Sequence, residues 1–309
     1  MNPLNNFTIF IDIVKRALQF LILSVVLLGL VGCNATDSKS VPEFLVSVSV
    51  TVDTPESIGS GIAFTRKDSK GNNVTFIWTA GHVVRHHDVV DPLTFLFTNP
   101  GTNLPVIIPP NHVYTYLTNL SVIQDVITNG EFAYKTNLCV TLIKCSPDDE
   151  GQDLAILRVE GNFFNTNTVV FDLSGRIPKL GEPLYGVSSP FSEYASFSTG
   201  VYSSIGRRVD GLVYDQTTLV VFPGSSGGGV FSTNGLCMGL NDAMRESGMN
   251  YIIPIRRIQK WAKEEHMEWA LDPSIPMPSE EELKSLKLTD KTPRTMDLKT
   301  PRTIHDLFQ

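Results

Sequence analysis

Short runs rich in valine, isoleucine, threonine and phenylalanine recur along most of the chain, and clusters of glycine, proline and asparagine separate them. This pattern is typical of β-strands joined by turns. Apolar residues alternate over residues 43–52, which predicts the first strand. The runs 58–64 and 74–78 flank a turn at 70–73 and predict a hairpin. No strong helical period appears before residue 254, so the chain is expected to be rich in β-structure.

The second half of the chain carries further strand signals. The Asn234-Gly235 pair, which lies between two apolar runs, is the strongest short-range hairpin signal in the sequence. The other predicted strands lie within residues 139–145, 154–159, 177–187, 197–206, 212–222 and 251–253. Residues 85–138 contain prolines that interrupt short apolar runs, which predicts a hairpin with long surface loops.

An amphipathic helix is predicted over residues 254–270, opened by Pro254. Its apolar side would consist of Ile255, Ile258, Trp261, Ala262 and Trp269. Residues 271–309 are rich in proline, lysine and acidic residues and contain a repeat of eight to nine residues at 291–298 and 299–307. Their low apolar content predicts a disordered tail, and a docking segment is the alternative.

The first 32 residues read as an export signal. The apolar run from Ala17 to Gly32 is shorter than the roughly 20 residues that a membrane span needs. Leu30 to Cys33 resembles the lipobox of bacterial lipoproteins, which implies cleavage before Cys33 and lipid attachment to it. Residues 33–42 would then form a tether, and the protein would be anchored in the cell envelope, facing the periplasm or the exterior. An uncleaved N-terminal anchor helix is the alternative.

Composition narrows the classes of partner. The 309 residues are 42% hydrophobic and 18% charged, which suits a folded core, and the net charge of −7 offers no basic field for nucleic acid. Cys139 and Cys145 lie about 20 Å apart along one predicted strand and cannot bridge each other. With Cys237 they are expected to be buried free thiols, because no zinc-ligand spacing appears.

The run His86-His87-Asp88 contains side chains that could bind a metal ion. Adjacent histidines do not easily face one ion from a regular element, so a solvated loop is favoured. No metal or cofactor is expected.

Candidate chemistry lies in the stretch from Pro223 to Phe231, where Ser225 and Ser226 are flanked by glycines. Glycine allows a backbone to approach a ligand closely, so this loop suits the presentation of a nucleophile, although a flexible turn has the same composition. A serine hydroxyl needs a base and donors for the developing oxyanion. His82, at a strand end among small residues, and Asp153 supply a base and an orienting acid.

The order of His82, Asp153 and Ser226 resembles that of the trypsin-like serine proteases, and their local contexts resemble the HtrA/Deg branch most closely. Thr79 to Val84 is similar to Thr-Asn-Ala-His-Val-Val of that branch. Asp153 to Leu157 is similar to its Asp-Ile-Ala-Leu-Leu, and Pro223 to Gly228 to its Pro-Gly-Asn-Ser-Gly-Gly. The resemblance covers residues 43–265 except for the 85–138 region.

This resemblance implies an all-β fold of two six-stranded antiparallel barrels with a C-terminal helix. The protease domain would span residues 43–270, with the first barrel at 43–165, the second at 177–253 and the helix at 254–270. It assigns His82, Asp153 and Ser226 to the catalytic triad. The backbone N–H groups of Gly224 and Ser226 would form the oxyanion hole. The specificity pocket would be formed by Val220, Met238, Gly239, Leu240 and Asn241, which implies cleavage after apolar or small residues.

Two departures from the family pattern stand out. Ser225 replaces an asparagine or aspartate, which removes the zymogen switch that captures a freed N-terminus. No PDZ-like domain is expected to fit after residue 270, so the peptide-sensing, oligomer-tuning part of many HtrA proteins would be missing. The sequence therefore predicts a serine endopeptidase that acts on unfolded or flexible protein segments outside the cytoplasm. A catalytically weak, protease-fold binding lipoprotein is the alternative.

Overall fold

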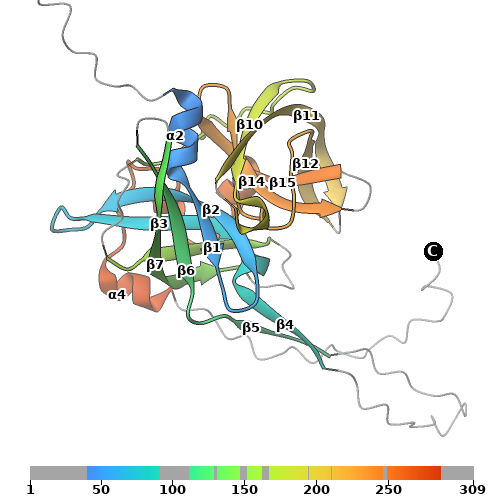
Figure 1. The fold of residues 1–309 in the computed structure, drawn as a ribbon. Helices are drawn as coiled ribbons and strands as arrows, with labels where there is room; N and C mark the ends of the chain where they lie inside the picture. Colours follow the sequence, from blue (N-terminus) through green and yellow to red (C-terminus); the bar gives the residue numbers. More distant parts are fainter. Residues whose placement is uncertain are drawn as a thin grey trace, which may run out of the picture. The chain divides into compact units, whose positions relative to one another are not determined.

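The computed structural model describes residues 40–90, 111–128, 131–146, 152–161, 167–193, 195–209, 211–245 and 249–286. Within them the chain folds almost entirely as antiparallel strands, with short helices between and after them (Figure 1). The expected signal peptide, the lipidation site Cys33 and the repeat at 291–307 lie outside the described residues.

Six strands of the first half close into a barrel in the order β1-β2-β3-β8-β7-β6. Every pairing in the ring is antiparallel. The strands are β1 (Ser49–Asp53), β2 (Ile58–Lys67), β3 (Asn73–Ala80), β6 (Ser121–Thr128), β7 (Glu131–Cys145) and β8 (Leu154–Val159). Val50, Val52, Ile77, Val122 and Leu157 belong to the buried cluster of this barrel.

Six strands of the second half also form a closed antiparallel ring, because β13 pairs with both β10 and β14. They are β10 (Pro183–Ser188), β11 (Ser196–Val209), β12 (Leu212–Thr217), β13 (Gly229–Ser232), β14 (Leu236–Arg245) and β15 (Met249–Pro254). The short strand β9 (Val170–Phe171) adds to β14 in parallel, outside the ring. The predicted all-β fold of two six-stranded barrels is confirmed.

The remaining elements connect or cover the barrels. Strands β4 (Arg85–Val90) and β5 (Asn111–Tyr116) form a two-stranded ribbon of their own, which is the hairpin expected within residues 85–138. His86, His87 and Asp88, which were expected in a solvated loop, lie instead in the paired strand β4. Within the described ranges the helices are α2 (Val41–Val48), η1 (Gly81–Val83), η3 (Pro190–Ser192), α3 (Ile255–Glu264), η4 (Glu268–Ala270) and α4 (Glu280–Ser285).

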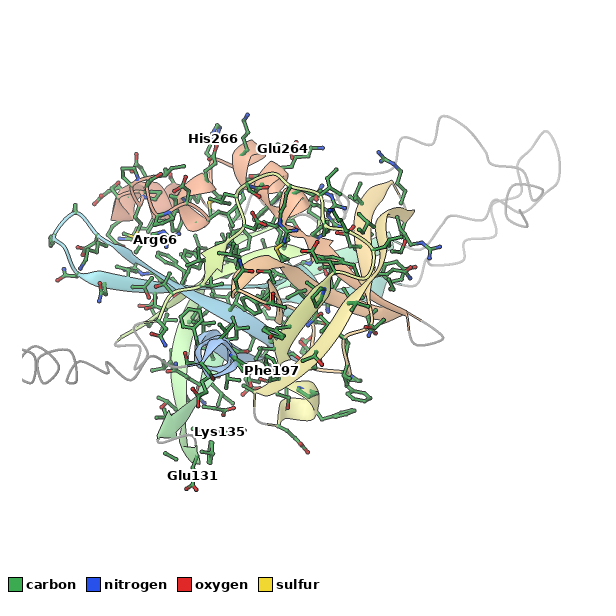
Figure 2. The ribbon with its side chains drawn as sticks, turned by 90° about the horizontal axis from the view of Figure 1, so that it is seen from above. Arg66, Glu131, Lys135, Phe197, Glu264 and His266 are labelled. Carbon is green, nitrogen blue, oxygen red and sulfur yellow. The ribbon has the colours of Figure 1, made fainter. Side chains whose placement is uncertain are left out.

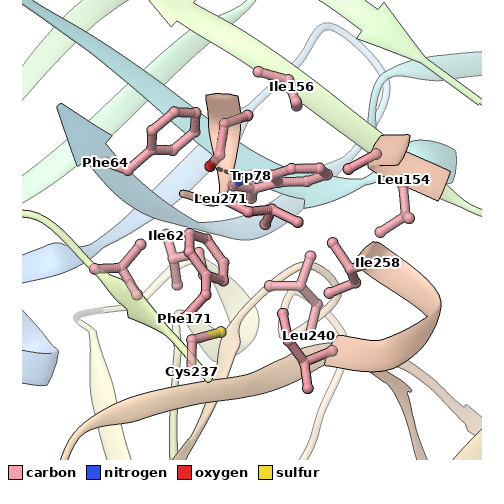
Figure 3. Close-up of a cluster of buried hydrophobic side chains, with 14 of the residues drawn as sticks. Ile62, Phe64, Trp78, Leu154, Ile156, Phe171, Cys237, Leu240, Ile258 and Leu271 are labelled. Atoms are coloured by element: carbon pink, nitrogen blue, oxygen red, sulfur yellow. Dashed lines mark hydrogen bonds between the residues drawn. The ribbon is translucent and has the colours of Figure 1, made fainter. Parts of the chain in front are cut away.

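The largest apolar cluster is shared by both barrels and the C-terminal segment (Figure 3). Trp78 of β3 packs edge-on against Trp261 of α3 and donates its indole N–H to the carbonyl of Ala270, at 3.1 Å. Arg66 of β2 donates to the carbonyl of Trp269 and lies beside the C-terminal segment (Figure 2). Leu154 and Leu240, which adjoin the candidate site in sequence, are fully buried in this cluster, so the same core supports the site from both barrels.

The predicted strand at 43–52 is wrong in its first half, where the structure has the helix α2 before β1 begins at Ser49. Leu45 and Val48 are fully buried, and Val41 and Phe44 pack beside them on the same core. These four positions follow the i, i+3, i+4, i+7 spacing of a helix face, and two of them also fit the alternation of a strand. α2 also takes in the last two residues of the expected tether.

The expectation of a disordered tail is wrong for residues 271–286. α4 begins with a capping box between Ser279 and Glu282, and Leu283 is buried. Arg158 of β8 donates two hydrogen bonds to the Glu280 carboxylate, at 2.5 and 2.9 Å. Two buried leucines, Leu271 and Leu283, and the Arg158–Glu280 ion pair attach this segment to the core and to the first barrel, contacts that its composition does not reveal.

Two smaller expectations are also corrected. The helix predicted over 254–270 is α3, which ends at Glu264, and η4 follows after a break at His266, whose φ is +57°. All five predicted apolar-face residues are buried. The three cysteines are free, but Cys139 is exposed. A register shift in β7 between Leu142 and Lys144 turns Cys145 inward and leaves Cys139 outside.

Candidate active site

His82 and Asp153 lie side by side because their strands are paired. Ala80 at the end of β3 is opposite Leu154 at the start of β8 in the antiparallel register. His82 follows in η1, and Asp153 directly precedes β8. Residues 71 positions apart in the sequence therefore reach one edge of the first barrel, where the Gly81 N–H donates to the Asp153 carbonyl at 2.9 Å.

The Asp153 carboxylate accepts three hydrogen bonds from His82 and Arg85. Its Oδ2 lies 2.7 Å from His82 Nδ1. Its Oδ1 accepts from the backbone N–H of His82, at 2.7 Å, and from Arg85 Nη2, at 3.0 Å. The Asp153 side chain is 14% exposed, whereas the His82 side chain is 46% exposed. The acid is therefore enclosed, and the ring of the base faces outward from it.

Asp153 adopts a left-handed backbone conformation, with φ of +54°. Such a conformation is uncommon outside glycine and persists only where surrounding contacts hold it. The bonds from Gly81, His82 and Arg85 supply those contacts.

The protonation of this pair follows from its hydrogen bonds. Desolvation opposes the charge of each group, but their mutual hydrogen bond and attraction outweigh it. The pKa of His82 is raised above its usual value, and the pKa of Asp153 lies well below its usual range. Asp153 therefore remains ionised and orients the Nδ1–H form of His82.

The Ser226 loop depends on glycine at two positions. Gly224 and Gly227 have φ of +93° and +84°. A Cβ at Gly227 would lie 2.2 Å from the Ser60 carbonyl oxygen, and one at Gly224 would lie 2.8 Å from the Ser189 carbonyl oxygen. The loop consequently lies directly against the end of β2.

Ser60 of β2 fastens this loop to the first barrel. Its N–H donates to the Ser226 carbonyl at 2.7 Å, and its Oγ donates to the Gly224 carbonyl at 2.6 Å. The Ser60 Oγ also accepts from the Ser189 N–H at 2.8 Å. One buried serine therefore holds the backbone carbonyls of the two residues on either side of Ser225.

The two candidate nucleophiles have different surroundings. Ser225 is fully buried, and its Oγ accepts from the Ser188 hydroxyl and from the Phe222 N–H. Ser226 is partly exposed, and its Oγ donates to the backbone carbonyl of Asp242 at 2.9 Å. Within the described part of the chain, no hydrogen bond joins Ser226 to His82. Of the two hydroxyls, only that of Ser226 lies where a substrate can reach it.

The backbone N–H groups of Gly224 and Ser226 have no hydrogen-bond acceptor among the described residues. Their neighbours all have one, since the N–H groups of Ser225, Gly227 and Gly228 donate to the carbonyls of Phe222, Asn241 and Ser225. Two unused donors, one residue apart beside a serine hydroxyl, suit an oxyanion.

A surface cavity of about 490 Å³ adjoins the loop at Pro223 and Gly224. It is lined by residues 53–58 of the β1–β2 turn, by Phe191 and Ser192, and by those two loop residues. Of the two residues with unused N–H groups, Gly224 lines this cavity and Ser226 does not.

The predicted pocket residues do not share one exposed wall. Met238 and Leu240 of β14 are buried in two different apolar clusters, and Asn241 is also buried. A Cβ on Gly239 would meet the Ile253 carbonyl. Val220, expected at the pocket base, is 57% exposed.

Sequence reasoning missed three residues of the site: Ser60, Arg85 and Asp242. Asp242 immediately follows Asn241 in β14, and its carboxylate lies with His82 and Asp153 in one group whose ligand atoms are all within 4.8 Å of one another. His82 Nδ1 and Asp153 Oδ2 are only 2.7 Å apart, a hydrogen-bond distance that leaves no space for a shared metal ion. Only the position of Arg85, three residues after His82, offered a local signal.

Comparisons with known proteins identify the family of the chain. The profile of the trypsin-like peptidase domain matches residues 59–240. A Pseudomonas putida protein named "Probable periplasmic serine endoprotease DegP-like" is 33% identical over 115 residues, which cover 35% of this chain and 23% of that protein. The Xenopus laevis "Serine protease HTRA1" is 28% identical over 127 residues, which cover 38% of this chain and 27% of that protein. The matched part thus spans about a quarter of the length of these relatives.

Solved structures were also matched. The serine endoprotease from Yersinia pestis has a TM-score of 0.48 and 19% identity, covering 74% of this chain and 65% of that one. Deg5 has a TM-score of 0.49 and 20% identity, covering 71% of this chain and 89% of that one.

Proposed function

Because the chain belongs to the trypsin-like peptidase domain family, we propose that it is a serine endopeptidase with Ser226 as nucleophile, His82 as general base and Asp153 as orienting acid. The observation that carries the proposal is the convergence of an enclosed His82–Asp153 pair and a partly exposed serine beside two unused N–H groups.

The proposed reaction begins with attack of Ser226 Oγ on the peptide carbonyl carbon, while the hydroxyl proton passes to His82 Nε2. Asp153 holds Nδ1, so Nε2 is the nitrogen left to accept that proton. The C–N bond then breaks as His82 returns the proton to the leaving amine, and an acyl-enzyme remains. Water, deprotonated by His82, attacks the ester and releases the acid and the Ser226 hydroxyl.

The N–H groups of Gly224 and Ser226 would stabilise the negative oxygen of both tetrahedral intermediates. Each such donor lowers the barrier by about 3 kcal/mol when it is aimed at the oxyanion. The bond from Ser60 Oγ to the Gly224 carbonyl supports this role, because it fixes the orientation of the loop beside the nucleophile.

The alternative of a catalytically weak binding protein rests on one specific observation. The Ser226 hydroxyl donates to the Asp242 carbonyl instead of to a base. If the protein is an enzyme, rotation about the Cα–Cβ bond of Ser226 frees its hydroxyl for His82 when substrate enters. Catalytic hydrogen bonds are often not formed in the absence of substrate.

Hydrolysis of β-casein, an unfolded protein, separates the two functions. We expect the wild-type protein to cleave it and Ser226→Ala to reduce turnover by on the order of 10⁴-fold or more. Ser203→Ala, an exposed serine of β11, is the matched control and should retain the wild-type rate. Equal activity in wild type and Ser226→Ala, or stable casein binding without cleavage by the folded wild type, would overturn the enzyme assignment.

We also propose that the protein acts outside the cytoplasm on unfolded or flexible segments, anchored through lipid on Cys33. Support comes from the lipobox-like Leu30 to Cys33 and from a relative whose name describes it as periplasmic. No helix in the described part of the chain combines the length and the apolar character needed to cross a bilayer. In a bacterial host, Cys33→Ala should move the protein out of the membrane fraction, and continued membrane association would contradict the anchor.

A further inference from the structure

Asp242 contacts both halves of the candidate site. Its backbone carbonyl accepts the Ser226 hydroxyl, and its carboxyl lies in one group with the Asp153 carboxyl and the His82 ring, whose ligand atoms are all within 4.8 Å of one another, which places the two carboxyl groups close enough to share a proton. The residue owes this position to a β-bulge. Asn241 pairs with Ile252 and Ala243 pairs with Tyr251, so Asp242 is the extra residue between two consecutive partners. A bulge redirects the side chain of its extra residue, here toward the edge of the first barrel.

A hydrogen bond between two carboxyl groups requires that one of them carry a proton. Asp153 receives donors from His82 and Arg85, which stabilise its ionised form. Desolvation and the negative charge of Asp153 raise the pKa of Asp242 to about 7. The proton of the carboxyl pair therefore belongs to Asp242, which donates to Asp153.

We propose that Asp242 is a positioning residue of the active site, whose neutral carboxyl donates to Asp153 and whose ionisation raises the proton affinity of His82. The inference rests on the proposed function only for its consequence on catalysis. The structural part of the inference is that three residues, Asp242, Asp153 and His82, are joined in a row by two hydrogen bonds.

Among the residues that the structure describes, four titratable or charged groups face Asp242. Asp153 precedes β8, His82 lies in η1, Arg257 comes from α3 and Tyr214 comes from β12. The charges of His82 and Arg257 favour ionisation of Asp242, but they do not overcome its desolvation and the repulsion from Asp153.

Arg257 holds the backbone beside this cluster in place. Its Nε and Nη2 donate to the side-chain oxygen and the backbone carbonyl of Gln152, at 3.0 and 2.6 Å. The guanidinium also lies 4.5 Å from the centre of the Tyr214 ring. These bonds attach the backbone immediately before Asp153 to α3, on the side of the site that faces Asp242.

The charge of Asp242 has a direct effect on His82, because a negative carboxylate nearby stabilises the imidazolium. Asp242→Asn keeps an N–H donor for Asp153 and removes the titrating charge. Asp242→Ala removes both. The two variants therefore separate the hydrogen bond from the charge.

The decisive measurement is an NMR titration of the His82 ring nitrogens in Ser226→Ala protein, which needs no activity. The His82 signal is assigned by its loss in a His82→Gln variant. Asp242→Asn on this background should lower the pKa of His82, whereas Asp172→Asn should leave it unchanged, because Asp172 follows β9 and its carboxylate binds Ser174 and Arg176, outside the site. An unchanged His82 pKa in folded Asp242→Asn protein would overturn the inference.

Activity supplies the second arm. In the otherwise wild-type enzyme, Asp242→Asn should move the acid limb of the kcat/KM profile to lower pH while its plateau stays within about threefold of wild type. Asp242→Ala should lower kcat about tenfold or more, the effect of losing one hydrogen bond to a charged group. A wild-type protein without activity would refute the proposed function and leave the titration result standing. An active wild type whose acid limb is unmoved by Asp242→Asn would refute the role of Asp242 alone.

Discussion

The two corners of the site are built differently. At the first barrel, His82 and Asp153 are joined by charge-assisted hydrogen bonds, with Arg85 as a further cation. At the second barrel, Ser226 is placed by backbone geometry, with Gly224 and Gly227 at positive φ and Ser60 holding the adjacent peptides. The first corner, called electrostatic below, is held mainly by charges. The second corner, called steric below, is held mainly by close backbone packing.

This difference means that the corners respond to different perturbations. A charged pair is sensitive to pH and to the loss of either charge. A loop of glycines beside a strand is sensitive to added volume and to the loss of its neutral hydrogen bonds. Asp242 is the residue that touches both, because its carboxyl faces Asp153 and its carbonyl accepts from Ser226.

The electrostatic corner should give the larger loss of activity. Asp153→Asn keeps the volume of the side chain but removes the charge that orients His82, so kcat/KM should fall by on the order of 10³-fold to 10⁴-fold. Steady-state hydrolysis of a peptide substrate measures it, with Asp172→Asn as control. A loss below about tenfold would mean that Asp153 does not orient the base.

The steric corner should give a smaller loss. Ser60→Ala removes the hydroxyl that holds the Gly224 carbonyl, which allows the loop that carries the Gly224 and Ser226 N–H groups to shift. We expect kcat to fall about 10-fold to 100-fold, with KM changed much less, because the donor acts mainly in the transition state. Thr65→Val, which removes one side-chain hydrogen bond further along β2, is the control. An equal change in KM and kcat for Ser60→Ala would point to general disruption of the strand.

The smallest expected effect is on the pH dependence of the free energy of unfolding, which should differ between the two corners. The folded pKa of Asp153 is depressed, so its ionised form contributes stability above the unfolded pKa of about 4, and that contribution is lost as pH falls. Urea unfolding between about pH 7 and pH 3 should show the difference between wild type and Asp153→Asn shrinking by roughly 1 to 2 kcal/mol. The difference for Ser60→Ala should stay constant, and a parallel decline would contradict the division into two kinds of corner.

The sequence was sufficient for features that depend on neighbouring residues. Alternation and turn residues predicted the hairpin of β2 and β3 and that of β13 and β14, and the family-like motifs located His82, Asp153 and Ser226. α2 was misread because Phe44 and Val48 fit both a strand and a helix face. α4 was missed because Arg158, the partner of Glu280, lies 122 residues away.

The rest of the site depends on contacts that no local pattern encodes. Ser60 acts on Gly224 across 164 residues, and it reads in the sequence as one serine of a glycine-rich strand. Asp242 reaches Asp153 only because a bulge displaces it from the ladder of β14. The contacts of these two residues form only when the two barrels pack together. They can therefore be found from the fold but not from a sequence motif.

The most direct test of the central claim is to react the folded protein with a fluorophosphonate and identify the modified residue by mass spectrometry. A serine is phosphonylated at a useful rate only where a base and an oxyanion hole activate it. We predict stoichiometric modification of Ser226 in the wild type, none in Ser226→Ala, and strongly slowed modification in Asp153→Asn. No uptake of the probe by folded wild-type protein, or equal uptake by Ser226→Ala, would contradict the assignment of this site to serine peptidase chemistry.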